Sequence, residues 1–587
     1  MASFFLPFLR YNDYTNIRKE MSELFKSKVK VRQPENEWFK ELTFYQIWCR
    51  SFKDGNGDGI GDLYGVLESL DYIKSLGVDA IWFSPLYKSP QADFGYDVAD
   101  YKDIDPDYGT LDTFRQVVEE AHKRGIRIIM DLVVNHSSDE CEWFKESLKG
   151  PDNPYHDYYF WRKGKDKDTP PNNWLSLFEG NAWEYNEDLD EYYLHIFAKK
   201  QPDLNHDNEK VREEVKDIMR FWLDMGVDGF REDVITYISK KPGLPDGLPI
   251  PFARGIENYD KGPNLDKYLR EYRETVADYE AIQIAETGMA TPRDAFHYTS
   301  GDDRVFDMLI TFDHMNADCL FIDAIHLPFS LRRLKHAFGK WQRRLYGKAW
   351  NLIYIENHDH ARVISRYGNK SYWKESGKAL ATATYMLTGT PFIYQGQEIG
   401  MLNTCFKDIS ECRDVVSFHI ERIFRDAHLP KCLLMWDINH TSREHARTPV
   451  QWNSKEYAGF SETEPWFPVN PNYNLINVAD EEKDPDSILN YYRKVLKVRK
   501  EYDSLFKGKY RDLKPLSGKI WCYEKYYGKE KALVMVSFSK KTRFTSVPLG
   551  YNLGKGKLIL HNYEGEPLTE GGFVKLRPYE AFVYIFD

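Results

Sequence analysis

Eight short apolar segments recur along the chain, and most of them are followed by a stretch with helical periodicity. Apolar runs of this length, set between helical stretches, are typical of buried parallel strands in βα units. Eight such units over about 350 residues favour an α/β fold of the closed (β/α)₈ barrel type, although periodicity alone also allows an open doubly wound sheet. The segments are residues 45–52, 79–85, 126–136, 227–234, 281–287, 307–313, 351–359 and 390–398.

Two regions depart from this pattern and predict additional domains. Residues 137–204, after the third apolar segment, are rich in Asp, Asn, Pro, Tyr and Trp, which indicates a loop enlarged into a subdomain. Residues 510–587 alternate short apolar strands with turn residues, which is typical of a C-terminal antiparallel β-sandwich. The barrel is therefore expected at residues 37–136 and 205–509, with residues 1–36 as an N-terminal extension.

Charge and cysteine content limit the possible partners and locations. The net charge of −11 is spread along 587 residues without a long basic run, which argues against nucleic acid and an anionic membrane surface as partners. No segment approaches the roughly 20 apolar residues that span a bilayer. The seven cysteines are scattered without a CxxC pair, and the start of the chain lacks a secretory signal pattern. We therefore expect a cytoplasmic protein that is a monomer or a weak homo-oligomer.

Charged and polar side chains fall at the ends of several predicted strands. The carboxyl ends of barrel strands converge on one face, where active sites lie. Each such group costs several kcal/mol to desolvate unless it is paired or used, so any single one could be a cap or a buried ion pair. Their recurrence predicts one site rich in carboxylates. The residues are Asp131, Asn135, His136, Arg231, Asp233, Glu286, His358 and Asp359.

These strand ends also resemble a known family. DLVVNH (131–136), GFRED (229–233), AET (285–287) and ENHD (356–359) look like the four signature segments of the α-amylase superfamily, glycoside hydrolase family 13. Three further segments are similar to its oligo-1,6-glucosidase, dextran glucosidase and α-glucosidase branch. They are QPDLN (201–205), RTPVQW (447–452) and DGNGDGIGDL (54–63). The resemblance runs from about residue 37 to the end of the chain.

The resemblance implies a retaining mechanism that uses two carboxyl groups about 5–5.5 Å apart. Asp233 matches the family nucleophile and Glu286 the acid/base. Glu286 is protonated near neutrality only if burial and nearby negative charge raise its pKa. Arg231 should orient Asp233 and keep it ionised. Asp359 matches the third carboxylate, which binds sugar hydroxyls and helps to distort the ring.

The same resemblance implies a closed pocket for one glucose unit. His136 and His358 match histidines that hydrogen-bond its hydroxyls, and Tyr96 matches the ring that stacks beneath it. Asp93 and Arg447 match an acid–arginine pair that reads the non-reducing end and makes the enzyme exo-acting. Arg447 could instead form an ordinary surface ion pair, worth about 0–1 kcal/mol, but RTPVQW matches as a whole segment.

The linkage specificity rests on the residue after the nucleophile. In this branch Val, as in Val234, accompanies α-1,6 preference, so hydrolysis of isomaltose and short gluco-oligosaccharides is expected; Val234 could also be a plain strand-end residue. Four departures from the branch leave the chemistry intact but put the substrate in doubt. They are Glu232, Ala285, His206 and Ala361. Because side chains alternate along a strand, Glu232 should point away from Asp233.

Other functions remain open at this stage. An α-glucosidase on other α-linked disaccharides (α-1,4, sucrose or its isomers, trehalose-type) would use the same residues, and so would a sucrose isomerase or transglucosylase. The isomerase branch carries an RLDRD-type loop after the seventh strand, where this chain reads ARVISRYGNKSYW. A non-enzymatic amylase-like module would have lost the carboxylates that are present here.

One acidic loop has the ligand spacing of a structural Ca²⁺ site. Alternating side-chain oxygens and one carbonyl suit Ca²⁺ or Mg²⁺ but not zinc. The twelfth position lacks the Glu of an EF-hand, and a solvated Asp/Gly turn is the alternative. The expected ligands are Asp54, Asn56, Asp58, the carbonyl of Ile60, and Asp62.

Overall fold

Eight parallel strands form one sheet, as the sequence predicts. In this computed structural model, which describes residues 37–178, 180–250, 253–320 and 325–587, their order is β11-β10-β9-β5-β2-β1-β15-β14, and all seven neighbouring pairs are parallel. The first and last strands of this order, β11 and β14, also lie next to each other, which closes the barrel. The predicted extension, residues 1–36, lies outside the described residues. The strands are β1 (Phe44–Ile47), β2 (Ala80–Phe83), β5 (Arg127–Leu132), β9 (Gly229–Glu232), β10 (Ile282–Glu286), β11 (Met308–Ile310), β14 (Leu352–Ile353) and β15 (Thr390–Tyr394).

Each barrel strand is followed along the chain by an amphipathic helix. Helix α5 shows the reason, because its buried residues Val211, Val215, Ile218 and Trp222 recur at helical spacing, and the side chain of Asn208 caps its first turn. The helices, in the order of their strands, are α2 (Leu63–Ser75), α3 (Leu111–Lys123), α5 (Glu209–Asp224), α7 (Leu265–Ala277), α8 (Pro292–Thr299), α9 (Leu331–Leu345), α11 (Trp373–Tyr385) and α15 (Ile488–Glu501).

Three excursions extend the barrel. The predicted insertion contains α4 (Glu142–Ser147) and a small sheet of β6 (Trp161–Arg162), β8 (Glu191–Leu194) and β7 (Trp183–Asn186). The other two were not predicted. One is a hairpin of β3 (Tyr87–Lys88) and β4 (Asp100–Ile104), and the other is the helix pair α12 (Val415–Asp426) and α13 (Lys431–Thr441) between β15 and α15.

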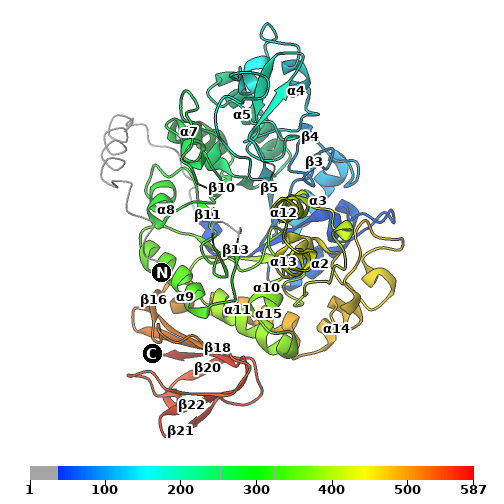
Figure 1. Ribbon diagram of the computed structural model, residues 1–587. Coiled ribbons are helices and arrows are strands. Elements are labelled where there is room, and N and C mark those ends of the chain that lie inside the picture. The colour runs from blue at the N-terminus through cyan, green and yellow to red at the C-terminus, as the bar shows by residue number, and fades with distance from the viewer. Residues whose placement is uncertain (1–36, 179, 251–252, 321–324) are drawn as a thin grey trace.

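The C-terminal region is a two-layered antiparallel sandwich, as predicted. A five-stranded sheet has the order β16-β17-β18-β23-β20, and a three-stranded sheet has the order β19-β22-β21. Buried side chains of both sheets, such as Met535 and Val574, share one apolar cluster. Figure 1 shows this sandwich and the insertion that contains α4 at opposite ends of the molecule. The strands are β16 (Lys509–Asp512), β17 (Ile520–Tyr527), β18 (Glu530–Ser537), β19 (Arg543–Ser546), β20 (Lys557–His561), β21 (Leu568–Glu570), β22 (Phe573–Leu576) and β23 (Ala581–Phe586).

Candidate active site

Arg231, in strand β9, joins three carboxyl groups from three neighbouring strands. Its Nη1 donates to Asp131 Oδ1 at 2.7 Å and to Asp233 Oδ1 at 2.6 Å, while Nη2 lies 2.7 Å from Glu286 Oε2. The parallel register places Asp131 directly beside Arg231, and Glu286 ends the strand on the other side. The predicted nucleophile and acid/base therefore share one guanidinium.

Burial dominates the titration of this cluster. It raises the pKa of Glu286 to about 8, with Asp233 and Asp359 adding to the rise and Arg231 opposing it. Burial likewise raises the pKa of Asp233 and Asp131, and Arg231 only partly offsets it. Arg231 thus favours the ionised form of Asp233, as expected, while burial opposes it. Because Glu286 has the higher pKa, it is the first of the pair to hold a proton.

The residue after the nucleophile has a backbone conformation that its side chain disfavours. Val234 lies at φ 35° and ψ 36°, in the left-handed region, where β-branched residues are rare and strain of about 1–3 kcal/mol is typical. The same turn directs the Val234 N–H to Glu286 Oε2 at 3.1 Å. The turn after β9 thus contributes a backbone donor to the acid/base, which nothing in the sequence indicated.

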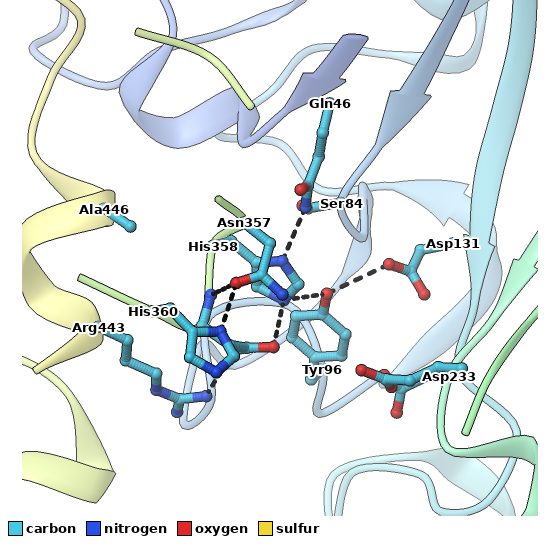
Figure 2. A network of polar contacts seen from close by, with 12 residues as sticks. Gln46, Ser84, Tyr96, Asp131, Asp233, Asn357, His358, His360, Arg443 and Ala446 are labelled. Carbon is cyan, nitrogen blue, oxygen red and sulfur yellow. Dashed lines mark hydrogen bonds and ion pairs between the residues drawn. The ribbon is translucent and has the colours of Figure 1, made fainter. Parts of the chain in front are cut away.

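His358 is fixed as a neutral imidazole. Gln46 Nε2 lies 2.7 Å from His358 Nδ1 and can only donate, so the ring proton is on Nε2. That nitrogen faces the Tyr96 hydroxyl at 2.7 Å and Asp359 Oδ2 at 3.1 Å, and Tyr96 in turn donates to Asp131 Oδ2 at 3.2 Å (Figure 2). Burial lowers the pKa of His358 to about 3, which keeps the ring uncharged.

The expected direct pair of Asp93 with Arg447 is not formed. Asp93 pairs instead with Arg443, whose Nη2 lies 2.9 Å from Asp93 Oδ1 and whose Nη1 donates to Asp359 Oδ1 at 3.0 Å. Arg447 is ion-paired with Asp414 and lies 3.5 Å from Asp359 Oδ1. Arg443 stands between the two expected partners because Asp414, at the start of α12, also binds it at 2.7 Å.

Asp359 and Asp93 respond differently to this arginine pair. Burial would raise the pKa of Asp359, but the His358 ring and the charges of Arg443 and Arg447 lower it well below its usual range. Burial outweighs Arg443 at Asp93 and raises its pKa to about 6. The Asp359 side chain is 26% exposed, more than any other carboxylate bound to these arginines, so it is the one most open to a ligand.

His136 contacts the backbone of Tyr96. Its Nε2 is 3.1 Å from the Tyr96 carbonyl oxygen and 3.2 Å from Gln201 Nε2, and burial lowers its pKa to about 4. Gln201 also donates to Asp93 Oδ2 at 3.2 Å. Gln201 therefore links two of the predicted residues, a role that sequence reasoning missed although the residue opens the QPDLN segment.

Two of the four departures from the family pattern have clear structural roles outside the site. Glu232 is fully buried on the outer side of β9, where it accepts a hydrogen bond from Gln283, so it points away from Asp233 as expected. Burial raises its pKa to about 8. His206 joins the segment after β5 to helix α7. It donates to the Val134 carbonyl and accepts from the Tyr272 hydroxyl, each at 2.7 Å.

The side chains of the predicted metal loop form hydrogen bonds within the loop. Asp54 accepts the backbone N–H groups of Gly57 at 2.6 Å and Gly59 at 2.8 Å, and Asp62 caps α2 through Gly65 N–H at 2.7 Å. Asn56 and Asp58 hydrogen-bond each other, and the Ile60 N–H is bound by Asp58. Among the described residues, no three His, Cys, Asp or Glu side chains form a group that could hold a metal ion.

The site combines six carboxyl groups with only three guanidinium groups. Such an excess of buried negative charge favours a positively charged transition state and keeps a proton on one carboxyl. Two carboxyl groups held together at the carboxyl ends of barrel strands are the arrangement that a glycoside hydrolase requires. The acids are Asp93, Asp131, Asp233, Glu286, Asp359 and Asp414, and the arginines are Arg231, Arg443 and Arg447.

Comparison with known proteins gives the family. The model for the alpha amylase catalytic domain matches residues 46–508. An oligo-1,6-glucosidase from Parageobacillus thermoglucosidasius is 46% identical over 558 residues, which cover 94% of this chain and 99% of that protein. The chain belongs to the α-amylase family, glycoside hydrolase family 13, and is an enzyme of the oligo-1,6-glucosidase/α-glucosidase type.

Solved structures of enzymes with two other activities are also similar to this chain, at 39–40% identity. The crystal structure of a trehalose-6-phosphate hydrolase from Bacillus licheniformis has a TM-score of 0.88 and 40% identity, covering 94% of this chain and all of that chain. The trehalulose synthase of Pseudomonas mesoacidophila MX-45 gives a TM-score of 0.88 at 39% identity, with the same coverage. The fold and overall identity therefore leave the substrate open. In the described part of the chain, no helix is long and apolar enough to cross a membrane.

Proposed function

We propose that this chain is an exo-acting, retaining α-glucosidase that hydrolyses the non-reducing-end α-1,6-glucosidic bond of isomaltose and short gluco-oligosaccharides. The observation that carries the proposal is the binding of Asp233 and Glu286 to the two terminal nitrogens of Arg231. This arrangement holds a nucleophile and a proton donor on the same side of the barrel, as double displacement at one anomeric carbon requires.

In the first step the Asp233 carboxylate attacks C1 of the terminal glucose. Glu286 gives its proton to the glycosidic oxygen, so the C1–O bond breaks and the shortened sugar leaves as an alcohol. In the second step Glu286, now ionised, takes a proton from water. The water oxygen bonds to C1, the C1–Asp233 bond breaks, and glucose leaves with its original configuration.

The residues around Asp359 would hold the terminal glucose. Neutral His358 can donate from Nε2 to a sugar hydroxyl, neutral His136 can form a hydrogen bond with another, and the Tyr96 ring offers an apolar face to the sugar. Asp93 would read the hydroxyls farthest from the scissile bond, with Arg443 and Arg447 fixing the carboxylates of this pocket. The linkage preference rests on Val234, a partly buried residue that packs against the apolar cluster containing Phe197 and Tyr237.

A panel of isomaltose, panose, maltose, trehalose, trehalose 6-phosphate, sucrose and isomaltulose, with products identified, tests this proposal. We expect kcat/KM to be highest for isomaltose and panose, with glucose released as the α-anomer. Rearrangement of sucrose without net hydrolysis would assign the chain to the isomerases instead. A clear preference for trehalose 6-phosphate would assign it to the phosphorylated-disaccharide hydrolases.

Replacing Arg443 by Ala should weaken recognition of the terminal glucose. The change leaves Asp93 and Asp359 without a partner that binds both, so we expect kcat/KM for isomaltose to fall by about 10²-fold, mainly through KM. Arg443→Lys keeps the charge but cannot bind two carboxylates as the guanidinium does. Its kcat/KM should lie between those of the unmodified enzyme and Arg443→Ala. Unchanged kinetics in Arg443→Ala would exclude it from the pocket.

We also propose that the loop from Asp54 to Asp62 binds a structural Ca²⁺, or Mg²⁺ in its place. The support is the spacing of hard oxygen ligands along the loop, whose side-chain oxygens now accept backbone N–H groups that a bound ion would compete with. Elemental analysis of the purified protein should find about one divalent ion per chain, and chelation should lower Tm. A protein without bound metal and with a Tm unaffected by chelation would contradict this.

A further inference from the structure

A cavity of about 400 Å³ lies mainly at the amino ends of the barrel strands, away from the catalytic carboxylates at their carboxyl ends. Its lining comes from the short helix Trp38–Lys40, the end of α8, helix α9 and the segments that lead into β14 and β15. Most of these segments precede their strands, at the amino ends of the barrel, whereas Thr311 and His314 of the lining follow β11. The cavity also lies beside β11 and β14, the two strands at the ends of the hydrogen-bonded order. The volume is within the range of small-molecule sites.

The walls of this cavity combine aromatic rings with buried polar atoms that have no partner. His314 is 4% exposed, and its Nε2 has no hydrogen-bond partner among the described residues; the same holds for Asn351 Oδ1. A buried polar atom without a partner costs about 1–3 kcal/mol, so a ligand hydroxyl within reach of these two atoms would be favoured. The aromatic rings of the lining are Phe39, Phe338, Trp341, Tyr346, Trp350 and Tyr527.

The cavity is basic in a protein whose net charge is −11. Four of its lining residues are cationic, and Glu37 is the only acid among them. No described carboxylate lies within ion-pair distance of one of the four, Lys348, although the other three have carboxylate partners. This charge distribution favours an anionic ligand. The four cations are Lys40, Arg304, Lys348 and Lys507.

Two buried basic side chains contact lining residues of the cavity. Arg499 donates to backbone carbonyls before β15, including that of Gly389, and Lys525 donates to the Thr388 hydroxyl. In the described part of the chain neither has a carboxylate partner, and both Thr388 and Gly389 line the cavity. Burial lowers the pKa of Lys525 well below its usual range and that of Arg499 to about 9, and an anion in the cavity would favour the charged form of both.

We propose that this cavity is a binding site for a monosaccharide phosphate. The sugar ring lies against the aromatic walls, its hydroxyls bond His314 and Asn351, and the phosphate binds beside Lys348. The argument uses no residue of the catalytic cluster, so this proposal stands or falls independently of the proposed hydrolytic reaction.

Isothermal titration of the full chain with glucose 6-phosphate, glucose and inorganic phosphate tests the site. We expect one saturable site for glucose 6-phosphate with a Kd of about 0.1–1 mM, and weaker binding of either fragment alone. Lys348→Glu and Asn351→Asp, which place negative charge in the cavity, should each weaken binding at least about tenfold while kcat/KM for isomaltose is retained.

Lys167→Glu provides the matched control, because this exposed lysine undergoes the same charge change in the insertion between β6 and β7, none of whose residues lines the cavity. Its Kd should equal that of the unmodified chain. Two results would overturn the proposal. One is no saturable binding by the unmodified chain at ligand concentrations up to about ten times the expected Kd, and the other is binding that Lys348→Glu and Asn351→Asp leave unchanged.

Discussion

Replacing Asp233 by Ala should lower kcat for isomaltose by at least about 10⁴-fold, because no other group can bond to C1 from the same position. A loss of this size corresponds to about 5.5 kcal/mol of transition-state stabilisation. Among the described residues Asp233 forms an ion pair only with Arg231, which stays bound to Asp131 and Glu286, so the fold and the circular dichroism spectrum should be retained. Azide, a small nucleophile that fits the vacated space, should restore turnover and give β-glucosyl azide as the product.

Glu232→Gln is the control for this experiment, because it removes a buried carboxyl one residue away that faces the other side of the strand. It should keep kcat within about threefold of the unmodified enzyme, since its partner Gln283 is also outside the site. If Asp233→Ala kept near-normal activity, or if Glu232→Gln lost as much activity as Asp233→Ala, the nucleophile would have been assigned to the wrong residue.

The barrel strands and the central carboxyl groups were predictable because they depend on local sequence. A run of apolar residues buried on both faces marks each parallel strand, and a charged residue at its carboxyl end marks the catalytic face. Arg231, Asp233 and Glu286 meet for this reason alone. The outward direction of Glu232 followed in the same way from the alternation of side chains along β9.

The arginine contacts could not be predicted, because they depend on how the helix pair α12–α13 folds over the site. Arg443 and Arg447 lie four residues apart in one 3-10 segment, and sequence spacing gives no reason for Asp93 to pair with the first. Asp414 binds both arginines and so fixes which of them faces Asp93. It lies about 30 residues before them, in an inserted segment that carries no strand-end signal. The left-handed turn at Val234 was equally hidden, because such turns are expected at Gly or Asn.

The acid/base assignment predicts a loss that depends on the leaving group. In Glu286→Gln the amide keeps the size of the side chain but cannot protonate the glycosidic oxygen, so kcat for isomaltose should fall by about 10²–10⁴-fold. An aryl α-glucoside with a good leaving group needs no proton, so its first step should survive while hydrolysis of the glucosyl–Asp233 ester becomes slow. Rapid-quench kinetics should then show a burst of released phenol, and mass spectrometry should find the glucosyl-enzyme.

The pH profile separates this role from a merely structural one. Glu286 must be protonated to act as the acid, and its pKa is raised to about 8, so kcat/KM of the unmodified enzyme should fall as the pH rises through about 8. In Glu286→Gln that alkaline decline should disappear, because the titrating group is gone, while the acidic decline caused by protonation of Asp233 should persist. An alkaline decline that survives the substitution would mean that another group provides the proton, and Glu286 would keep only its contact with Arg231 and the Val234 N–H.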